Sequence, residues 1–175
     1  MAGRRAQSDG AADFTAVVTE HWTAVYRLMY QMSGHRHDAD ELTQEAFTKA
    51  LENWRVFKPG SNARAWIMRI ATNLYLDDRR KKSRRNTGPM IEEPASKAVS
   101  HEAGLEQREL AELLRTAIEE LPETARLVFH LRTTDEMSFR EIGELAGISE
   151  EAARWHMHQA RLKLQQRLRD DESLP

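Results

Sequence analysis

The stretch that decides the fold is SFREIGELAGISEEAARWHMHQARLKLQQRL, at residues 138–168. Ser138 and Glu141 have the spacing of a capping box, in which the serine hydroxyl accepts a hydrogen bond from the Glu141 amide and the glutamate side chain reaches back. Gly147 stands where a first helix has to end in a left-handed conformation, and Ser149 can cap the helix that follows. The stretch therefore predicts a helix-turn-helix unit.

The sequence also indicates which residues of this unit lie in its core. Gly143 lies inside the first helix, where glycine costs stability, so we expect another backbone to pass close to it. On the first helix, four residues are predicted to face a core: Phe139, Ile142, Leu145 and Ala146. The second helix has one apolar stripe, formed by Ala153, Met157, Ala160, Leu164 and Leu168.

The second helix also carries charge of a single sign. It has five basic residues and no acidic one between residues 152 and 169: Arg154, Arg161, Lys163, Arg167 and Arg169. Helical geometry turns Trp155, His158 and Gln159 away from the apolar stripe, and an outward tryptophan needs a covering partner. In a chain of formal net charge −2, this local concentration indicates contact with nucleic acid.

A DNA major groove fits this surface. Arg154 and Gln159 can bond base edges, and Trp155 can meet a thymine methyl group. Arg161 and Lys163 can hold phosphates. The alternative is a helical hairpin whose basic face is only solvated, but the small residues flanking the turn argue against it. The predicted duplex contacts are Arg154, Trp155, His158, Gln159, Arg161 and Lys163.

The composition favours an all-α protein. The 175 residues are 40% hydrophobic and 31% charged, and they suffice for one domain or two small ones. No apolar run is long enough to span a membrane, so we expect no membrane insertion. Residues 1–12 have no apolar run and are expected to form a flexible leader rather than a secretory signal. With the absence of cysteine, this indicates a cytoplasmic protein.

Apolar spacing predicts three helices in the first half of the chain. One runs from Phe14 and stops near Gly34, a second has Asp38 and Glu41 as its N-terminal cap, and a third begins at about Ala63. The pattern disappears between residues 86 and 104 and then returns as further helices. We therefore expect two small helical domains, at residues 13–86 and 105–170, joined by a flexible linker at 87–104.

Charge is segregated in the first domain. Residues 38–52 carry five acidic side chains and one basic, a net of −4, whereas residues 63–86 carry eight basic and two acidic, a net of +6. Separate acidic and basic regions indicate at least two kinds of partner. The alternative is that these charges are scattered over solvated helix faces.

Taken together, these segments resemble the extracytoplasmic-function group of bacterial sigma-70-type sigma factors. The resemblance covers residues 14–168 and depends on several pieces in the family's order. They are DADELTQEAF at 38–47, FKPGSNARAW at 57–66, RIATN at 69–73 followed by Asp77, Leu121-Pro122, SFREIGELAGIS at 138–149 and Ala160-Arg161.

The resemblance implies a promoter-specificity subunit of RNA polymerase. Its first domain, of sigma region 2 type with three or four helices, is expected to recognise and melt the −10 element. Its second, of region 4 type, is expected to bind the −35 element. Implied partners are the clamp of the polymerase's largest subunit, the flap of its second-largest subunit, promoter DNA and an anti-sigma factor. The residues that match the clamp-binding surface are Asp40, Leu42, Gln44 and Glu45.

The −10 contacts follow from the resemblance and from side-chain chemistry. The loop at residues 57–62 matches the one that receives an unstacked base, with Phe57 either lining that pocket or belonging to the core. On the third helix six residues are predicted to face away from the core: Ala65, Met68, Arg69, Thr72, Asn73 and Leu76. The expected −10 contacts are Phe57, Ser61, Asn62, Arg64, Arg69 and Asn73.

Two other classes of function compete with this interpretation. A helix-turn-helix regulator that binds duplex DNA without polymerase leaves the acidic surface at residues 38–52 unused. An enzyme is disfavoured because the sequence has no glycine-rich phosphate loop, no metal-ligand cluster and no nucleophile–base arrangement, so no catalytic residue and no cofactor is expected. His156 and His158 stand two apart, on different helix faces, and no metal site is expected there.

Overall fold

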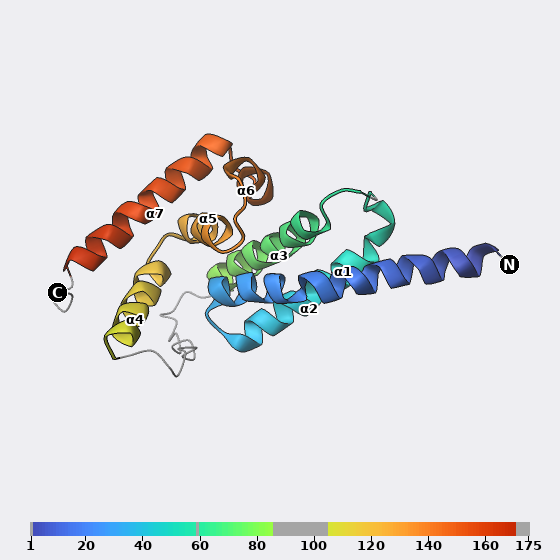
Figure 1. Cartoon of the computed structure of the whole chain (residues 1–175), viewed down its shortest axis with the longest axis horizontal. Coiled ribbons are helices and arrows are strands. Elements are labelled where there is room, and N and C mark those ends of the chain that lie inside the picture. Colours follow the sequence, from blue (N-terminus) through green and yellow to red (C-terminus); the bar gives the residue numbers. More distant parts are fainter. Residues whose placement is uncertain (1, 59, 86–104, 171–175) are drawn as a thin grey trace. The chain divides into compact units, whose positions relative to one another are not determined.

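The computed structural model describes residues 2–58, 60–85 and 105–170, and within these ranges the chain is all-α. It divides into two compact units, Met1–Pro94 and Ala95–Pro175, whose helices are labelled in Figure 1. The predicted linker at residues 87–104 lies outside the described residues. None of the described helices combines the length and apolar character needed to cross a lipid bilayer.

The described part of the first unit contains three long helices and one short 3₁₀ turn. They are α1 (Ala2–Ser33), α2 (Arg36–Glu52), η1 (Trp54–Val56) and α3 (Ala63–Arg85). Gly34 has a φ of 76° and directly follows the end of α1, as its position in the sequence predicts. The helix begins at Ala2, however, within the segment 1–12 that was expected to be a flexible leader. That segment has no proline to interrupt the helix.

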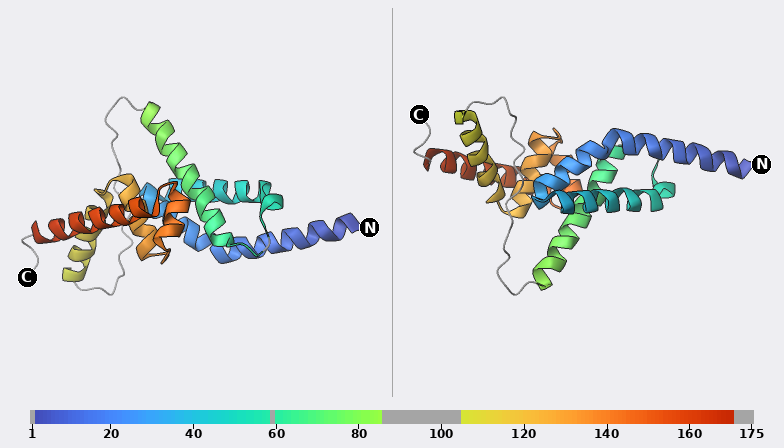
Figure 2. Two further views of the ribbon diagram at one scale, coloured as in Figure 1. Left: turned by 90° about the horizontal axis from the view of Figure 1, so that it is seen from above. Right: turned by 90° about the horizontal axis from the view of Figure 1, so that it is seen from below.

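Helix α3 packs against both α1 and α2 (Figure 2), so its buried face is wider than a single stripe. Met68 and Thr72 are fully buried, which makes their predicted outward orientation wrong. Of that predicted face, Arg69 and Asn73 are exposed. Near the middle of α3 the Tyr75 hydroxyl donates a buried hydrogen bond of 3.0 Å to the Met32 carbonyl at the end of α1.

The start of α2 differs from the expectation. Its N-cap is His35, which makes no side-chain capping bond, so the predicted cap at Asp38 and Glu41 is wrong. The Asp38 carboxylate instead receives Lys82 Nζ at 2.9 Å, and the same Nζ lies 2.9 Å from Asp78. Partial burial lowers the pKa of Lys82, but the hydrogen bonds to the two carboxylates outweigh it and raise the pKa above its ordinary value. This ion pair joins the first turn of α2 to the last third of α3.

The second unit is built around its longest helix. It contains α4 (Leu105–Glu119), α5 (Glu123–Thr133), α6 (Phe139–Ala146) and α7 (Glu150–Asp170), and α7 contacts the other three. The apolar stripe of α7 is buried as predicted, except that Leu168 is half-buried. The buried residues of the stripe are Ala153, Met157, Ala160 and Leu164.

The caps of α6 and α7 are those that the sequence predicts. Ser138 Oγ accepts from the Glu141 amide at 3.2 Å, and the Glu141 carboxylate accepts from the Ser138 amide at 2.8 Å. Hydrogen bonds from the Ser138 side chain and backbone lower the pKa of Glu141. Gly147 ends α6 at a φ of 69°, and Ser149 Oγ accepts from the Ala152 amide at 3.0 Å.

The close approach expected at Gly143 is also present. A Cβ added to this residue would stand 2.8 Å from the Ile148 carbonyl oxygen and 3.3 Å from the Glu150 nitrogen. Both are backbone atoms of the turn into α7, so neither can move aside as the end of a side chain can. The Ile148 amide in turn donates to the Gly143 carbonyl at 3.0 Å. Glycine at this position therefore sets how closely α6 approaches the start of α7.

We expect Gly143→Ala to loosen this turn. Overpacking costs about 1–3 kcal/mol, which exceeds the gain of at most about 1 kcal/mol from replacing glycine with alanine in a helix. Hydrogen exchange of the α6 amides in the full chain should therefore become faster. Glu144→Ala, an exposed change on the same helix, serves as the control and should change exchange little. Protection in Gly143→Ala equal to that of the wild type would contradict the steric argument.

A second expectation concerns pH. His130 is 6% exposed, and burial, together with the positive charge of Arg126, lowers its pKa to about 4. An unfolded histidine titrates near about 6.5, so between these values the unfolded state binds a proton that the folded state does not. The free energy of unfolding should therefore decrease by up to about 3 kcal/mol as the pH falls from about 6.5 to about 4, and this contribution changes no further below that.

Urea unfolding at pH 7 and at pH 5 measures this dependence. His130→Leu removes the titrating group, so its loss of stability between the two pH values should be smaller than that of the wild type. The difference between the two proteins isolates His130 from the carboxylates that also titrate. Equal losses in both proteins would show that His130 does not carry the effect.

Candidate nucleic-acid interface

The outward face of α7 gathers the residues predicted for duplex contact. Trp155 is 58% exposed, a high value for the largest apolar side chain. Gln159 is half-buried at the edge of this face. His156 packs edge-on against the Trp155 ring, with centroids 5.0 Å apart, and its partial burial lowers its pKa. The exposed polar residues of the predicted set are Arg154, His158, Arg161 and Lys163.

Arg154 does not stand alone on this face. Its Nη2 lies 2.5 Å from Glu150 Oε1, and its guanidinium carbon lies 4.9 Å from the centroid of the Phe139 ring. Arg132, at the end of α5, lies over the same ring at 5.1 Å. The sequence pattern predicts a core position for Phe139 and indicates no role for Arg132. Nothing in the sequence could pair Arg132 with residues of α6 and α7, because only the packing of the three helices brings them together.

The last turns of α7 differ from the outward face. Arg167 Nε lies 3.9 Å from a carboxylate oxygen of Glu120, just beyond the end of α4. The positive charge of Arg167 is therefore partly neutralised within the second unit. Arg154, Arg161 and Lys163 are exposed nearer to the start of the helix, and Arg169 is exposed in its last turn.

In the first unit an aromatic cluster holds the loop before α3. Phe57 stacks on Trp54 with ring centroids 4.8 Å apart and an interplanar angle of 12°, and it lies 5.0 Å from the Trp66 ring. Phe14 of α1 packs edge-on against Trp54 at 5.2 Å. Phe57 is half-buried. Between the two roles left open for it, this packing favours a structural one.

The polar side chains of this loop form internal hydrogen bonds. Ser61 Oγ donates to the Lys58 carbonyl at 2.6 Å, and Gly60 has a φ of 84°. Asn62 Oδ1 accepts from the Ala65 amide at 3.0 Å and so caps the start of α3. This capping role was not recognised in the sequence, although asparagine before a helix is its usual indication. The side chains of Ser61 and Asn62 are therefore held by hydrogen bonds within the chain.

Helix α3 presents a polar stripe to solvent. Arg69 and Asn73 are exposed and lie one turn apart, whereas Arg64, near the start of the helix, is half-buried. Farther along, Arg80 pairs with Asp77 at 3.1 Å, and Lys82 is held by Asp38 and Asp78. The basic segment at residues 79–85 is therefore partly neutralised by its own neighbours.

The acidic face of α2 is only partly as predicted. Asp40, Gln44 and Glu45 are exposed, and Glu45 lies 3.4 Å from Lys49 one turn later. Leu42 is 7% exposed, so it supports the helix from the core side and is not part of the outer surface. The exposed set is therefore Asp40, Gln44 and Glu45.

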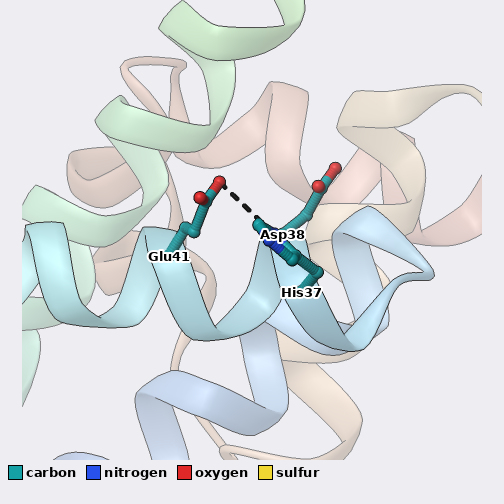
Figure 3. Close-up of side chains that lie close together, drawn as sticks. All are labelled: His37, Asp38 and Glu41. Atoms are coloured by element: carbon teal, nitrogen blue, oxygen red, sulfur yellow. Dashed lines mark ion pairs between the residues drawn. The ribbon is translucent and has the colours of Figure 1, made fainter.

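A polar groove of about 190 Å³ runs between α2 and α3. At one end His37, Asp38 and Glu41 have ligand-type atoms within 4.8 Å of one another (Figure 3). His37 Nδ1 lies 3.6 Å from Glu41, and the Asp38 carboxylate is bound to Lys82. The groove is lined by Asp38, Glu41, Leu42, Glu45, Lys49, Leu74, Asp77, Asp78, Lys81 and Lys82. Because Lys82 pairs with Asp38 and Asp78, and Lys49 pairs with Glu45, the groove is a region of internal ion pairs.

Comparisons with known proteins match each unit to a region of the same family. Residues 17–85 match the family described as Sigma-70 region 2, and residues 103–164 match Sigma-70, region 4. The ECF RNA polymerase sigma factor SigW of Bacillus subtilis is 31% identical over 167 residues, which are 90% of this chain and 89% of SigW. SigE of Mycolicibacterium smegmatis is 31% identical over 156 residues; these are 85% of this chain but only 58% of SigE.

Two solved structures share the fold. The sigma factor RpoE from Bartonella quintana, solved with the anti-sigma factor NepR, has a TM-score of 0.78 and 22% identity, over 91% of this chain and 99% of RpoE. CnrH, solved with the cytosolic domain of CnrY, has a TM-score of 0.68 and 23% identity, over 97% of this chain and 96% of CnrH.

The fold and the two family matches define a sigma factor, a class of protein that acts in transcription initiation and binds RNA polymerase and promoter DNA. The chain belongs to the ECF group of the sigma-70 family. Members of this family are not enzymes.

Proposed function

We propose that the second unit binds the −35 element through the outer face of α7. The observation that carries this assignment is the exposed Trp155 among the cations of a helix that follows a capped, glycine-spaced turn. Arg154 and Gln159 contact base edges, Trp155 contacts an apolar base edge, and Arg161 and Lys163 hold phosphates. His158 completes this contact set.

The first unit, in this proposal, recognises and opens the −10 element. Arg69 and Asn73 provide a phosphate contact and a two-way hydrogen-bonding group along one exposed stripe of α3. Ser61 and Asn62 lie directly before that helix, and Arg64 lies in its first turn. Phe57 contributes by holding the loop on the aromatic cluster.

The exposed acidic face of α2 is the proposed docking surface for the clamp of the polymerase's largest subunit. Asp40, Gln44 and Glu45 offer carboxylate and amide groups to a partner, and Leu42 keeps the helix in place beneath them. The second unit is proposed to contact the flap of the second-largest subunit. A sigma factor acts where its polymerase is, so we place the protein in the bacterial cytoplasm.

We also propose that an anti-sigma factor controls this protein. Support comes from RpoE, which shares its fold and was solved with the anti-sigma factor NepR. CnrH also shares the fold and was solved with the cytosolic domain of CnrY. The competing hypothesis is a regulator that binds duplex DNA without polymerase. That hypothesis gives no role to the exposed carboxylates of α2.

Clamp docking predicts the behaviour of the double variant Asp40→Ala/Gln44→Ala. Both side chains are exposed, so the helical content should not change, while complex formation with core polymerase and run-off transcription should both decrease. Glu20→Ala removes an exposed carboxylate from α1 and should leave both unaffected. If the wild-type chain formed no complex with core polymerase and directed no initiation, the sigma-factor assignment itself would be wrong.

The −35 assignment predicts a loss of promoter discrimination in Arg154→Ala/Gln159→Ala. Each lost base contact should reduce discrimination between promoters by about 1–3 kcal/mol. Promoters recovered by run-off transcription of a genomic library with core polymerase provide the test set. Gln166→Ala, an exposed change later in α7, should preserve the wild-type ranking of promoters. An unchanged ranking in the double variant would remove these residues from the contact set.

A further inference from the structure

Three side chains from three helices meet at the edge of the α7 face. Arg132 comes from the end of α5, Phe139 is the first residue of α6, and Arg154 lies in the second turn of α7. The guanidinium carbons of both arginines lie over the Phe139 ring, 5.1 Å and 4.9 Å from its centroid. The ring is half-buried and both arginines are exposed. A single aromatic ring thus holds two positive charges at the surface.

Each arginine is fixed by a second contact. Arg132 Nη1 donates a 2.8 Å hydrogen bond to the Met137 carbonyl, in the turn before α6. Arg154 is paired with Glu150 one helical turn earlier. The carbonyl partner of Arg132 carries no net charge, whereas Glu150 neutralises Arg154. Among Arg132, Arg154 and Glu150 one positive charge therefore remains uncompensated, and it lies on Arg132.

The aromatic contact also decides which parts of the guanidinium groups remain available. A guanidinium that lies over a ring uses its flat face and keeps its N–H edges for planar, bidentate bonds to phosphate oxygens. Because side-chain motion is restricted before binding, less freedom is lost when the anion arrives. In a helix-turn-helix protein the first helix crosses the DNA backbone while the second enters the major groove. Phe139 is the first residue of that first helix, and the Arg132 side chain reaches the turn before it, at the Met137 carbonyl.

We propose that Phe139 is a positioning residue for promoter binding, and that Arg132 binds a phosphate of the duplex whose bases Arg154 contacts. This inference rests on the −35 assignment and adds to it one contact residue, Arg132, and the ring that orients both arginines. Phe139 itself does not touch DNA. It holds Arg132 at the phosphate backbone and keeps Arg154 directed at the groove.

The salt dependence of duplex binding tests the proposal, because each phosphate contact adds to the slope of log affinity against log salt. The probe is a short mixed-sequence DNA duplex, titrated with the full chain at several potassium chloride concentrations. Arg132→Ala should reduce the slope by about one. Phe139→Leu keeps apolar bulk but loses the aromatic face, and it should weaken binding by about two- to fivefold.

Three comparisons separate positioning from packing. Phe139→Tyr keeps the ring and should bind like the wild type, and Arg167→Ala, which removes a cation already paired with Glu120, should keep the wild-type slope. The double variant Phe139→Leu/Arg132→Ala should lose less affinity than the sum of the losses in the two single variants, because both substitutions act through one contact. If Phe139→Tyr weakened binding as much as Phe139→Leu, the ring would serve packing alone and the proposal would be wrong.

The remaining outcomes distinguish this inference from the −35 assignment. If the wild type binds the duplex and Arg154→Ala weakens it, while Arg132→Ala leaves the slope unchanged, then the −35 assignment stands and the inference fails. If the wild-type chain does not bind duplex DNA, both fail together.

Discussion

The approach of two backbones at Gly143 is the constraint on which the second unit depends. With a Cβ only 2.8 Å from the Ile148 carbonyl, any other residue would push the start of α7 away from α6. The direction of α7 decides which of its residues enter the core and which reach solvent. A missing side chain in one helix therefore determines the surface that another helix presents, and Trp155 and its neighbouring cations face outward as a result.

Local chemistry made much of the fold predictable. The capping box at Ser138, the left-handed Gly147 and the cap at Ser149 each concern residues within a few positions of one another, and all three are present. The apolar stripe of α7 was predictable for the same reason, since one helix has one periodicity. The extension of α1 to Ala2 was not predicted, because residues 1–12 have no apolar run from which a helix could be inferred.

Contacts between different helices could not be predicted from the sequence. Met68 and Thr72 are buried because α3 packs against both α1 and α2. The apolar periodicity of one helix does not show how many helices pack against it. Asp38 pairs with Lys82, 44 positions away, and Arg132 joins Arg154 through the Phe139 ring. In the candidate site, the sequence predicted which residues of α7 face outward. It did not predict the contacts that these residues make with side chains of other helices. Ser61 and Asn62, which were predicted as DNA contacts, form hydrogen bonds to nearby backbone groups at Lys58 and Ala65.

The distribution of tryptophan has a practical consequence. Trp22, Trp54 and Trp66 all belong to the first unit and pack in aromatic contacts, whereas Trp155 is the single tryptophan of the second. Its indole is largely in water and touches the His156 ring. Anything that covers this face replaces water around one fluorophore whose environment is unlike that of the other three. The recognition helix therefore contains an intrinsic optical reporter of its own occupancy, and no label has to be attached.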